Sequence, residues 1–398
     1  MGPLAGLRIL DLTSVLMGPY ATQILGEMGA DVIKIEAPDG DVTRQIGPQR
    51  NPGMGPVFLN ANRGKRSVAM DLKAPGGAQA LLRLAESADV LVTNVRPRAM
   101  ARLGLGPEAL AAANPRLIQA ALVGFDQQGP YADRPAYDDL IQGAAGIPHA
   151  FERSGRAPAY IPTAAADRIV GLSAVNAILA AVIERDRSGL GQRVEIPMFE
   201  TMAAMVMGDH MGGLVYDPPH GPSGYPRHLS PDRRPYATAD GWICALVYTD
   251  AHWRRFFAAI GRPEMPAADA RYATFPARMA NINLVYSELS AILQTRTTEE
   301  WLALFQEADI PAMPMHSFES LLEDPHLTAT GFFRREDHPT EGPILGMAVP
   351  ARFSRTPAAP DRPAPGLGLD GEAVLSEAGF SADEIATLTR SGALRRPA

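Results

Sequence analysis

The stretch LRILDLTSVLMGPYATQILGEMGADVIKIE, residues 7–36, decides the fold class. It begins with a short apolar run over residues 7–12 and ends with a second one over 31–36, and both runs are typical of buried strands. Between them we predict a turn at Gly18-Pro19 and a helix over residues 20–28. Two strands joined by a helix form a βαβ unit, so this stretch predicts a parallel sheet.

The same alternation continues along the first half of the chain, which is therefore predicted to be α/β. The further elements that we expect there are helices over 76–87, 107–113 and 167–186, and strands over 88–94, 116–124 and 192–196. A stretch rich in Gly, Pro, His and Arg between about 208 and 235 is expected to be a linker or loop, and beyond it the chain has strand and helix signals of its own. The helices expected there cover 250–260, 298–308 and 381–390.

Composition and charge exclude several classes of protein. The chain has 398 residues and a formal net charge of −7, which argues against a nucleic-acid or acidic-membrane partner because both need a broad basic surface. Its single cysteine, Cys244, excludes an intrachain disulfide and a cysteine-based metal cluster, and no other metal site is predicted. We expect no signal peptide and no membrane span, and we predict a cytoplasmic protein.

Known nucleotide and hydrolase motifs do not occur. The first strand leads into TSVLMGPY and not into the G-x-G-x-x-G turn that brings backbone close to a pyrophosphate, so NAD binding is not expected. The segment GFDQQG at 124–129 does not have the G-x-S-x-G pattern of a nucleophile elbow, so a serine hydrolase has little support.

Asp167, in the segment TAAADRIVG at 163–171, has two interpretations from the residues alone. It stands where an extended stretch meets the long apolar helix, so its side chain can cap the helix by accepting a backbone N–H bond. Alternatively, its small neighbours Ala164, Ala165 and Ala166 leave space for a ligand beside a reactive carboxylate. Spacing does not choose between these interpretations.

Several motifs in the same order resemble the class III CoA-transferase (CaiB/BaiF) family, which also includes the 2-methylacyl-CoA racemases. The matching segments are DLTSVLMGPYATQILGEMGADVIKIEAPDGD at 11–41, NRGKRSVAMDLK at 62–73, NVRPRAMARLG at 94–104, AYDDLIQGAAG at 136–146, ADRIVGL at 166–172, AILAAVIERDRSGLGQRVEIPM at 177–198 and EADIPAMPM at 307–315. The resemblance covers nearly the whole chain.

The resemblance implies a fold as well as a chemistry. Family members have a large Rossmann-like domain built from both chain ends and a smaller inserted α/β domain, and two chains interlock as a homodimer. In this sequence the large domain is expected over 1–208 and 321–398, and the small domain over 225–320. The substrates implied are acyl-CoA and carboxylic acids, with no permanently bound cofactor.

In family transferases the Asp of the D-x-x-x-G segment is the nucleophile, and Asp167 is at that position. A carboxylate attacks a thioester and remains a leaving group afterwards, so CoA passes between acids through an aspartyl-CoA thioester. The resemblance also implies CoA contacts, with Lys73 and Arg102 as cations for the CoA phosphates. The other residues expected to contact CoA are Leu16, Met17, Asn94, Val95, Arg96 and Leu103.

The alternative function is a 2-methylacyl-CoA racemase, which needs a second acid/base opposite the Asp. Family racemases supply a His there, whereas this chain has Tyr137, and a phenol with an ordinary pKa near about 10 is a poor base at neutral pH. A non-catalytic acyl-CoA-binding protein is a third interpretation, which the presence of Asp167 disfavours.

The sequence gives less information on which carboxylic acid is the substrate. Oxalate- and formate-using members tend to have basic residues where this chain has Ala37 and Val123, so those substrates are not expected. Arg227, Arg233 and Arg234 lie near the predicted domain boundary. If they face the active site they would bind the second carboxylate of a dicarboxylic acid, and otherwise they pair with Asp232 or lie at the surface.

Overall fold

The computed structural model describes residues 2–360 and 362–397. The chain divides into two compact units. The first unit consists of Met1–Ala145, Ile161–Ala204 and His326–Ala398, and the second of Gly146–Tyr160 and Met205–Pro325. The small domain expected over 225–320 lies within the second unit, which also contains 146–160.

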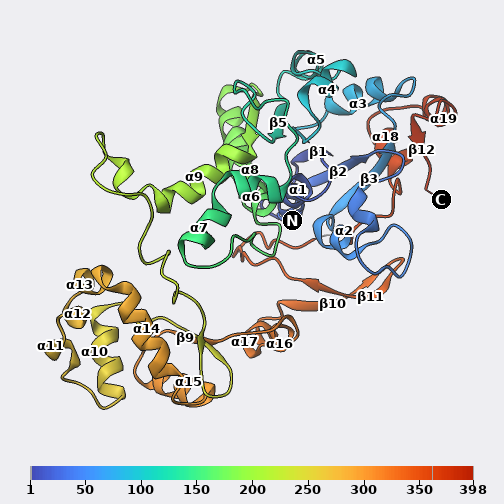
Figure 1. The fold of residues 1–398 in the computed structure, drawn as a ribbon. Coiled ribbons are helices and arrows are strands. Elements are labelled where there is room, and N and C mark those ends of the chain that lie inside the picture. The colour runs from blue at the N-terminus through green and yellow to red at the C-terminus, as the bar shows by residue number, and fades with distance from the viewer. Residues whose placement is uncertain (1, 361, 398) are drawn as a thin grey trace. The chain divides into compact units, whose positions relative to one another are not determined.

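The first unit is built on a seven-stranded sheet with the order β12-β3-β2-β1-β4-β5-β6 (Figure 1). Its strands are β1 (Arg8–Leu12), β2 (Asp31–Glu36), β3 (Lys65–Met70), β4 (Val90–Thr93), β5 (Ile118–Val123), β6 (Arg193–Pro197) and β12 (Leu394–Arg395). Neighbouring strands are parallel except that β12 is antiparallel to β3. The order reverses direction at β1 and β4, as in a doubly wound Rossmann-like sheet.

Helices cover both faces of this sheet. A hydrophobic cluster on one face joins the strands to α3 (Gly77–Ala85), α4 (Pro97–Arg102), α5 (Pro107–Ala113), α18 (Gly371–Glu377) and α19 (Ala382–Arg390). The opposite face has α1 (Met17–Glu27), and α8 (Ala165–Ser188) packs along α1 and α6 (Asp138–Ala144). The remaining elements are α2 (Pro56–Ala61), the 3-10 helix η1 (Val42–Gln45), α17 (Pro325–Ala329) and the hairpin β10 (Phe333–His338) and β11 (Gly342–Met347).

Close packing between α1 and α8 explains the glycine of the D-x-x-x-G segment. A Cβ atom at Gly171 would lie 2.9 Å from the carbonyl oxygen of Met17 and 3.1 Å from the Tyr20 ring. Arg168, one turn earlier, stacks 4.4 Å above the centroid of the same ring. Gly171 therefore allows the start of α8 to approach the start of α1, which brings Asp167 close to the loop that follows β1.

α8 is long and apolar enough to cross a membrane, with a mean hydropathy of 1.7 over its most apolar window. In the structure it is instead a helix of the α/β unit, and Val170, Ala174, Ile178 and Ala181 are buried there. Its apolar character is thus explained in part by packing within the chain.

Some predicted elements differ from those observed. Gly18-Pro19 is not a turn but part of the first turn of α1, which begins at Met17. Proline is tolerated there because the first N–H groups of a helix have no partner inside the helix. The strand β3 was not predicted, and α9 (Met198–His210) reaches into the segment that was expected to be a loop from about 208.

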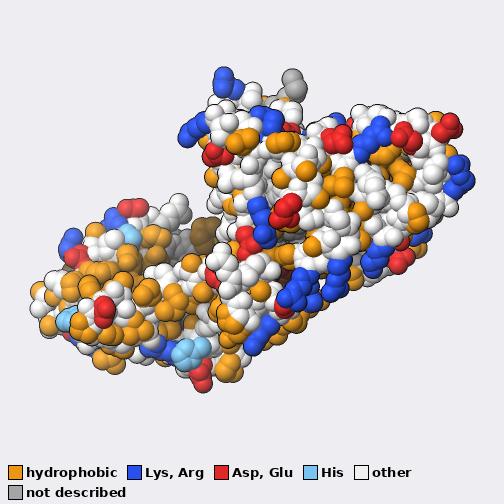
Figure 2. Space-filling view, turned by 90° about the horizontal axis from the view of Figure 1, so that it is seen from above, with side chains coloured by type: hydrophobic (Ala, Val, Ile, Leu, Met, Phe, Trp, Pro, Cys, Tyr) orange, Lys and Arg blue, Asp and Glu red, His pale blue; other side chains and the backbone are white. Residues whose placement is uncertain are grey.

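The second unit is built around aromatic side chains. Trp253, Phe256, Phe257, Trp301 and Phe305 form the centre of its hydrophobic cluster. Its antiparallel sheet has the order β7 (Tyr236–Ala237), β8 (Trp242–Ala245) and β9 (Ala312–Pro314). Its helices are α7 (Ile147–Arg153), η2 (Gly212–Val215), α10 (Asp250–Ala259), α11 (Met265–Ala268), α12 (Ala270–Ala273), α13 (Phe275–Ala280), α14 (Ile282–Leu293), α15 (Thr298–Glu307) and α16 (Phe318–Leu322). Hydrophobic side chains also cover much of the outer surface around α10–α13 (Figure 2).

Candidate active site

A cavity of about 240 Å³ lies in the first unit, at the carboxyl ends of β1, β4 and β5. It is lined by the loops that follow these three strands and by the first turn of α8. Ligands of doubly wound sheets bind in the crevice at the point where the strand order reverses, which here is between β1 and β4. The residues that line the cavity are Ser14, Val15, Met17, Asn94, Val95, Arg96, Pro97, Leu122, Val123, Gly124, Gln127, Ala132, Arg134, Pro135, Ala136, Tyr137, Asp138, Asp167 and Met198.

The loop after β1 is held in a strained conformation. Val15 has φ = 68°, which is rare for a β-branched residue. Its N–H donates to Oδ1 of Asp41 at 3.3 Å. The side chain of Asn94 bridges this loop to the end of β4, because Oδ1 accepts from the N–H of Ser14 at 3.1 Å and Nδ2 donates to the Ser14 carbonyl at 2.9 Å.

A network of buried charges supports this loop from below. The Lys34 ammonium pairs with Asp41 at 3.0 Å and donates to the Thr13 carbonyl at 2.8 Å. The Lys65 ammonium pairs with Asp11 at 2.9 Å and donates to the Pro19 carbonyl at 2.9 Å. Each lysine thus joins a carboxylate to the backbone of residues 13–19, and the network fixes the position of the cavity wall.

Asp167 is the third residue of α8 and is partly buried at the cavity wall. The interpretation of Asp167 as the helix cap is wrong, because α8 begins at Ala165, after Ala164, and has no side-chain cap. Instead Asp138, at the start of α6, accepts the backbone N–H of Asp167 through Oδ2 at 2.9 Å. Among residues 2–360 and 362–397 no group donates a hydrogen bond to the Asp167 carboxylate, so that carboxylate is available to a ligand.

The electrostatic setting raises the pKa of the Asp167 carboxyl to about 6. Burial is the main cause, the negative charge of Asp138 adds to it, and the positive charge of Arg168 opposes both. A carboxyl with a perturbed pKa in a cavity at the carboxyl ends of parallel strands is typical of a functional site.

Asp138 is a site residue that the sequence analysis missed. It directly follows Tyr137, which was identified only as the residue at the racemase His position. Its second oxygen, Oδ1, accepts from Nε2 of Gln142, and Oε1 of Gln142 accepts the backbone N–H of Ile161 at 2.9 Å. Asp138 is therefore oriented by Gln142 and in turn orients the backbone of Asp167. The only signal in the sequence was an acidic residue next to Tyr137.

The structure brings four of the eight predicted CoA-contacting residues to the cavity. Met17, Asn94, Val95 and Arg96 line it, as does Tyr137. Leu16 directly precedes Met17 and is 9% exposed.

Besides Leu16, three more predicted CoA contacts do not line the cavity. Lys73 is exposed on the loop between β3 and α3, and Arg102 is exposed at the end of α4. Leu103 is partly buried against the hydrophobic cluster of the sheet. In chain order, Lys73 follows β3, and Arg102 and Leu103 follow β4 at the end of α4.

The arginines predicted for the substrate pocket belong to the second unit. Arg234 pairs with Asp232 at 3.1 Å, as the surface interpretation predicted. Arg227 donates to the hydroxyl of Tyr286 at 2.9 Å and lies over the ring of Tyr248. Arg233 is exposed beside a shallow depression that Leu246 and Met313 also line.

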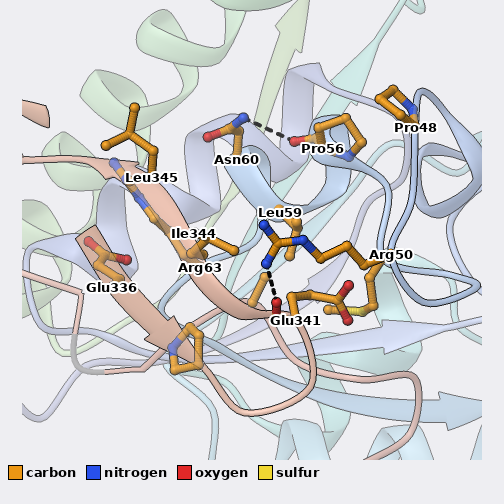
Figure 3. Close-up of a pocket in the computed structure, with 14 residues that line it drawn as sticks. Pro48, Arg50, Pro56, Leu59, Asn60, Arg63, Glu336, Glu341, Ile344 and Leu345 are labelled. Atoms are coloured by element: carbon orange, nitrogen blue, oxygen red, sulfur yellow. Dashed lines mark hydrogen bonds between the residues drawn. The ribbon is translucent and has the colours of Figure 1, made fainter. Parts of the chain in front are cut away.

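A second cavity of the first unit, of about 280 Å³, lies between the region of α2 and the β10–β11 hairpin. Figure 3 shows Arg50 directed at Glu341, whose carbonyl it reaches at 2.5 Å, and Asn60 directed at Pro56. Arg63 in this wall pairs with Glu27. Both arginines thus interact with protein groups, and none of the predicted site residues lines this cavity.

A Rossmann-like unit with a carboxylate of raised pKa in a cavity at the reversal point of its sheet is typical of enzymes that act on a bound small molecule. Comparison with known proteins identifies the enzyme family. The sequence profile described as CoA-transferase family III matches residues 4–371. The chain is 35% identical over 390 residues to the succinate–glutarate CoA-transferase of Agrobacterium fabrum, covering 94% of this chain and 95% of that protein.

Other relatives agree with this match. The formyl-CoA:oxalate CoA-transferase of Shigella sonnei is 32% identical over 421 residues, covering 98% of this chain and 99% of that protein. The crystal structure of a CaiB/BaiF family protein from Brucella suis superposes with a TM-score of 0.80 at 32% identity, covering 95% of this chain and 99% of that one. The chain belongs to CoA-transferase family III and is a class III CoA-transferase, so its substrates are CoA esters.

Proposed function

We propose that this enzyme moves CoA between carboxylic acids through an aspartyl-CoA thioester on Asp167. The observation that carries the proposal is the Asp167 carboxylate, which lines the cavity at the reversal point of the sheet without a donor from the described residues. The backbone N–H of Asp167 donates to Asp138, and this bond holds in place the part of the first turn of α8 from which the carboxylate extends.

The chemistry conserves thioester energy at every step. The Asp167 carboxylate attacks the acyl carbon, and the C–S bond breaks. CoA then leaves as a thiolate, and a mixed anhydride remains on Asp167. The thiolate then attacks the aspartyl carbonyl, which forms the aspartyl-CoA thioester and releases the donor acid as a carboxylate. An acceptor carboxylate repeats the two steps in reverse order and leaves Asp167 free. Each tetrahedral intermediate needs fixed donors for its oxyanion, for which we propose backbone N–H groups of the glycine-containing loops.

The raised pKa of Asp167 suits a nucleophile. Near neutral pH a carboxyl with a pKa of about 6 is still mostly ionised, but it is more basic than an ordinary aspartate. The repulsion by Asp138 that raises the pKa also disappears when Asp167 becomes a neutral anhydride or thioester. The environment therefore favours the acylated enzyme over the free carboxylate.

CoA is proposed to bind along the carboxyl edge of the sheet. Met17, Asn94, Val95 and Arg96 would contact it inside the cavity, with Leu16 beside them. Outside the cavity, the remaining proposed contacts are Lys73 and Arg102 for the phosphates and Leu103 on the adenine side. Lys73 and Arg102 are both exposed, as a phosphate site at the protein surface requires.

Dicarboxylic acids are the proposed acyl class. The relative from Agrobacterium is named for succinate and glutarate, and Ala37 and Val123 replace the basic residues expected in oxalate-using members. Racemisation is disfavoured, because the position that needs a second base has Tyr137, which lines the same cavity.

We further propose the interlocked homodimer, with a large domain of 1–208 and 321–398 and an inserted small domain of 225–320, in the cytoplasm. Apolar side chains at the surface of α8 support a protein partner, since Leu172 is 48% and Ile183 is 54% exposed. A second copy that covers this face would remove them from water.

The proposal is tested by an assay of CoA transfer between acyl-CoA and free acids with the variant Asp167→Asn. Asn cannot form the mixed anhydride, so the rate should fall at least about 1,000-fold. Asp186→Asn, at an exposed position of the same helix, is the matched control and should retain full activity. Transfer by Asp167→Asn at the wild-type rate would refute the proposed chemistry.

A further inference from the structure

Arg134 is a cation in the wall of the Asp167 cavity that no other function explains. Its guanidinium carbon lies 4.0 Å from the ring centroid of Tyr131, and its backbone N–H donates to the Tyr131 carbonyl at 2.9 Å. The neighbouring Asp133 pairs with Arg98 at 2.9 Å and not with Arg134. Within the described part of the chain Arg134 forms no ion pair, so its charge is not compensated by a protein carboxylate.

The aromatic support under Arg134 is anchored to the rest of the unit. The Tyr131 ring packs edge-on against Phe125 at 5.5 Å between centroids, and Phe125 packs against Phe199 of α9 at 5.7 Å. Gln127 closes the same loop, because its Nε2 donates to the carbonyls of Phe125 at 2.9 Å and Ala132 at 3.3 Å. The ring beneath the exposed Arg134 side chain is therefore fixed by contacts within the unit, and stacking on it limits the freedom that the guanidinium loses on binding.

A guanidinium stacked on a ring keeps its N–H edge free, and that edge matches the two oxygens of a carboxylate or phosphate. Two parts of an acyl-CoA substrate have such oxygens: the CoA phosphates and the free carboxylate of a dicarboxylic acyl group. The phosphates are separated from the reacting sulfur by the whole pantetheine arm, whereas Arg134 shares a cavity of only about 240 Å³ with Asp167. The geometry favours the carboxylate.

We propose that Arg134 binds the distal carboxylate of a dicarboxylic acid whose other carboxyl reacts at Asp167. The inference rests on the proposed function and deepens it, because it identifies the residue that selects diacids. It replaces none of the CoA contacts. Lys73 and Arg102 remain the cations proposed for the CoA phosphates, and Arg96, in the loop after β4, remains a proposed CoA contact.

The test measures KM and kcat for glutarate and for butyrate as acceptors with acetyl-CoA as donor. Arg134→Ala should raise KM for glutarate about 10- to 100-fold, since it removes a charge-assisted pair, and should leave KM for butyrate within about twofold. Arg134→Lys keeps the charge but loses the planar fork, so it should recover part of the glutarate affinity. Arg187→Ala, at an exposed position near the end of α8 that does not line the cavity, is the control and should behave as the wild type. Thermal unfolding of each variant checks that it is folded.

Other outcomes overturn the inference in distinguishable ways. A rise in KM for acetyl-CoA with Arg134→Ala that is absent with the 3′-dephospho-CoA thioester would assign Arg134 to a CoA phosphate. Equal effects on glutarate and butyrate, or no effect on either, would remove any role in selecting diacids. A wild-type enzyme that transfers CoA only to monocarboxylates would refute this inference alone, and one that transfers CoA to no acid would refute the proposed function as well.

Discussion

Asp11 and Asp167 are two carboxylates of the same unit, and both lie near the loop that follows β1. Their surroundings differ in the donors that each carboxylate has. Asp11, in β1, is fully buried and accepts bonds from Nζ of Lys65 at 2.9 Å, Oγ1 of Thr22 at 2.7 Å and the N–H of Thr13 at 2.9 Å. Asp167 is partly buried, and among the described residues its carboxylate has no donor. Both side chains are thus at least partly buried, and the main difference between them is the set of groups that donate to each carboxylate.

The partners decide the direction of each pKa. Burial alone would raise both values, because it disfavours the charged form. At Asp11 the ammonium groups of Lys65 and Lys34 outweigh burial and hold the pKa well below its usual range. At Asp167 the nearest carboxylate is Asp138, and the pKa rises to about 6. Asp11 is stabilised as a structural anion, whereas the Asp167 carboxylate has no such stabilisation from the described residues.

The largest predicted effect on stability is at Asp11. Asp11→Asn leaves the Lys65 ammonium buried without its carboxylate, so the free energy of unfolding should fall by about 3–5 kcal/mol. Urea titration of the full chain measures it. A loss below about 1 kcal/mol would show that the buried network does not depend on this charge.

Asp167→Asn should change stability in the opposite direction. The folded-state pKa lies above the ordinary value of 3.8, so the stability contributed by the protonated carboxyl is present below about pH 4 and is lost as the pH rises through about 6. At neutral pH the variant removes a destabilising charge. Its free energy of unfolding should therefore be roughly 1–3 kcal/mol higher than that of the wild type. A destabilised Asp167→Asn would contradict the contrast between the two carboxylates.

The pH dependence of CoA transfer gives a third prediction. The proposed nucleophile must be ionised, so kcat/KM should fall as the pH drops below about 6. Asp138→Asn removes the charge that raises this pKa, and the acid limb of the rate profile should move to lower pH. Asp139→Asn, at the exposed neighbouring position, is the control and should not move it.

The smallest effect is expected for an exposed ion pair. Arg98 and Asp133 are 77% and 62% exposed, so solvent screens their attraction. Arg98→Ala should lower the free energy of unfolding by less than about 1 kcal/mol in the same urea titration. A loss as large as that for Asp11→Asn would mean that burial is not what separates the two pairs.

Much of the fold was predictable because its signals are local. The apolar runs of β1 and β2 and the apolar helix around Asp167 follow from the order of residues in short windows. In contrast, β3 contains Lys65, Arg66 and Ser67, so it does not resemble a buried strand. Its polar side chains are tolerated because Asp11, Asp31 and Glu36 lie opposite them in the folded sheet.

The site was predictable only in part for the same reason. Asp167, Met17, Asn94, Val95 and Arg96 were identified through motif resemblance, and these residues meet at one cavity. Asp138 and Arg134 were not identified, because their roles depend on contacts made in space. The bond from Asp167 N–H to Asp138 joins residues that are 29 positions apart, and no spacing rule indicates it.

The most direct test of the account is to trap the acylated carboxyl itself. Trypsin releases the peptide APAYIPTAAADR, residues 157–168, whose single acidic side chain is Asp167. After incubation with acyl-CoA and hydroxylamine, mass spectrometry should find the aspartyl hydroxamate on this peptide in the wild type and not in Asp167→Asn. Steady CoA transfer with this peptide unmodified would contradict a covalent intermediate on Asp167.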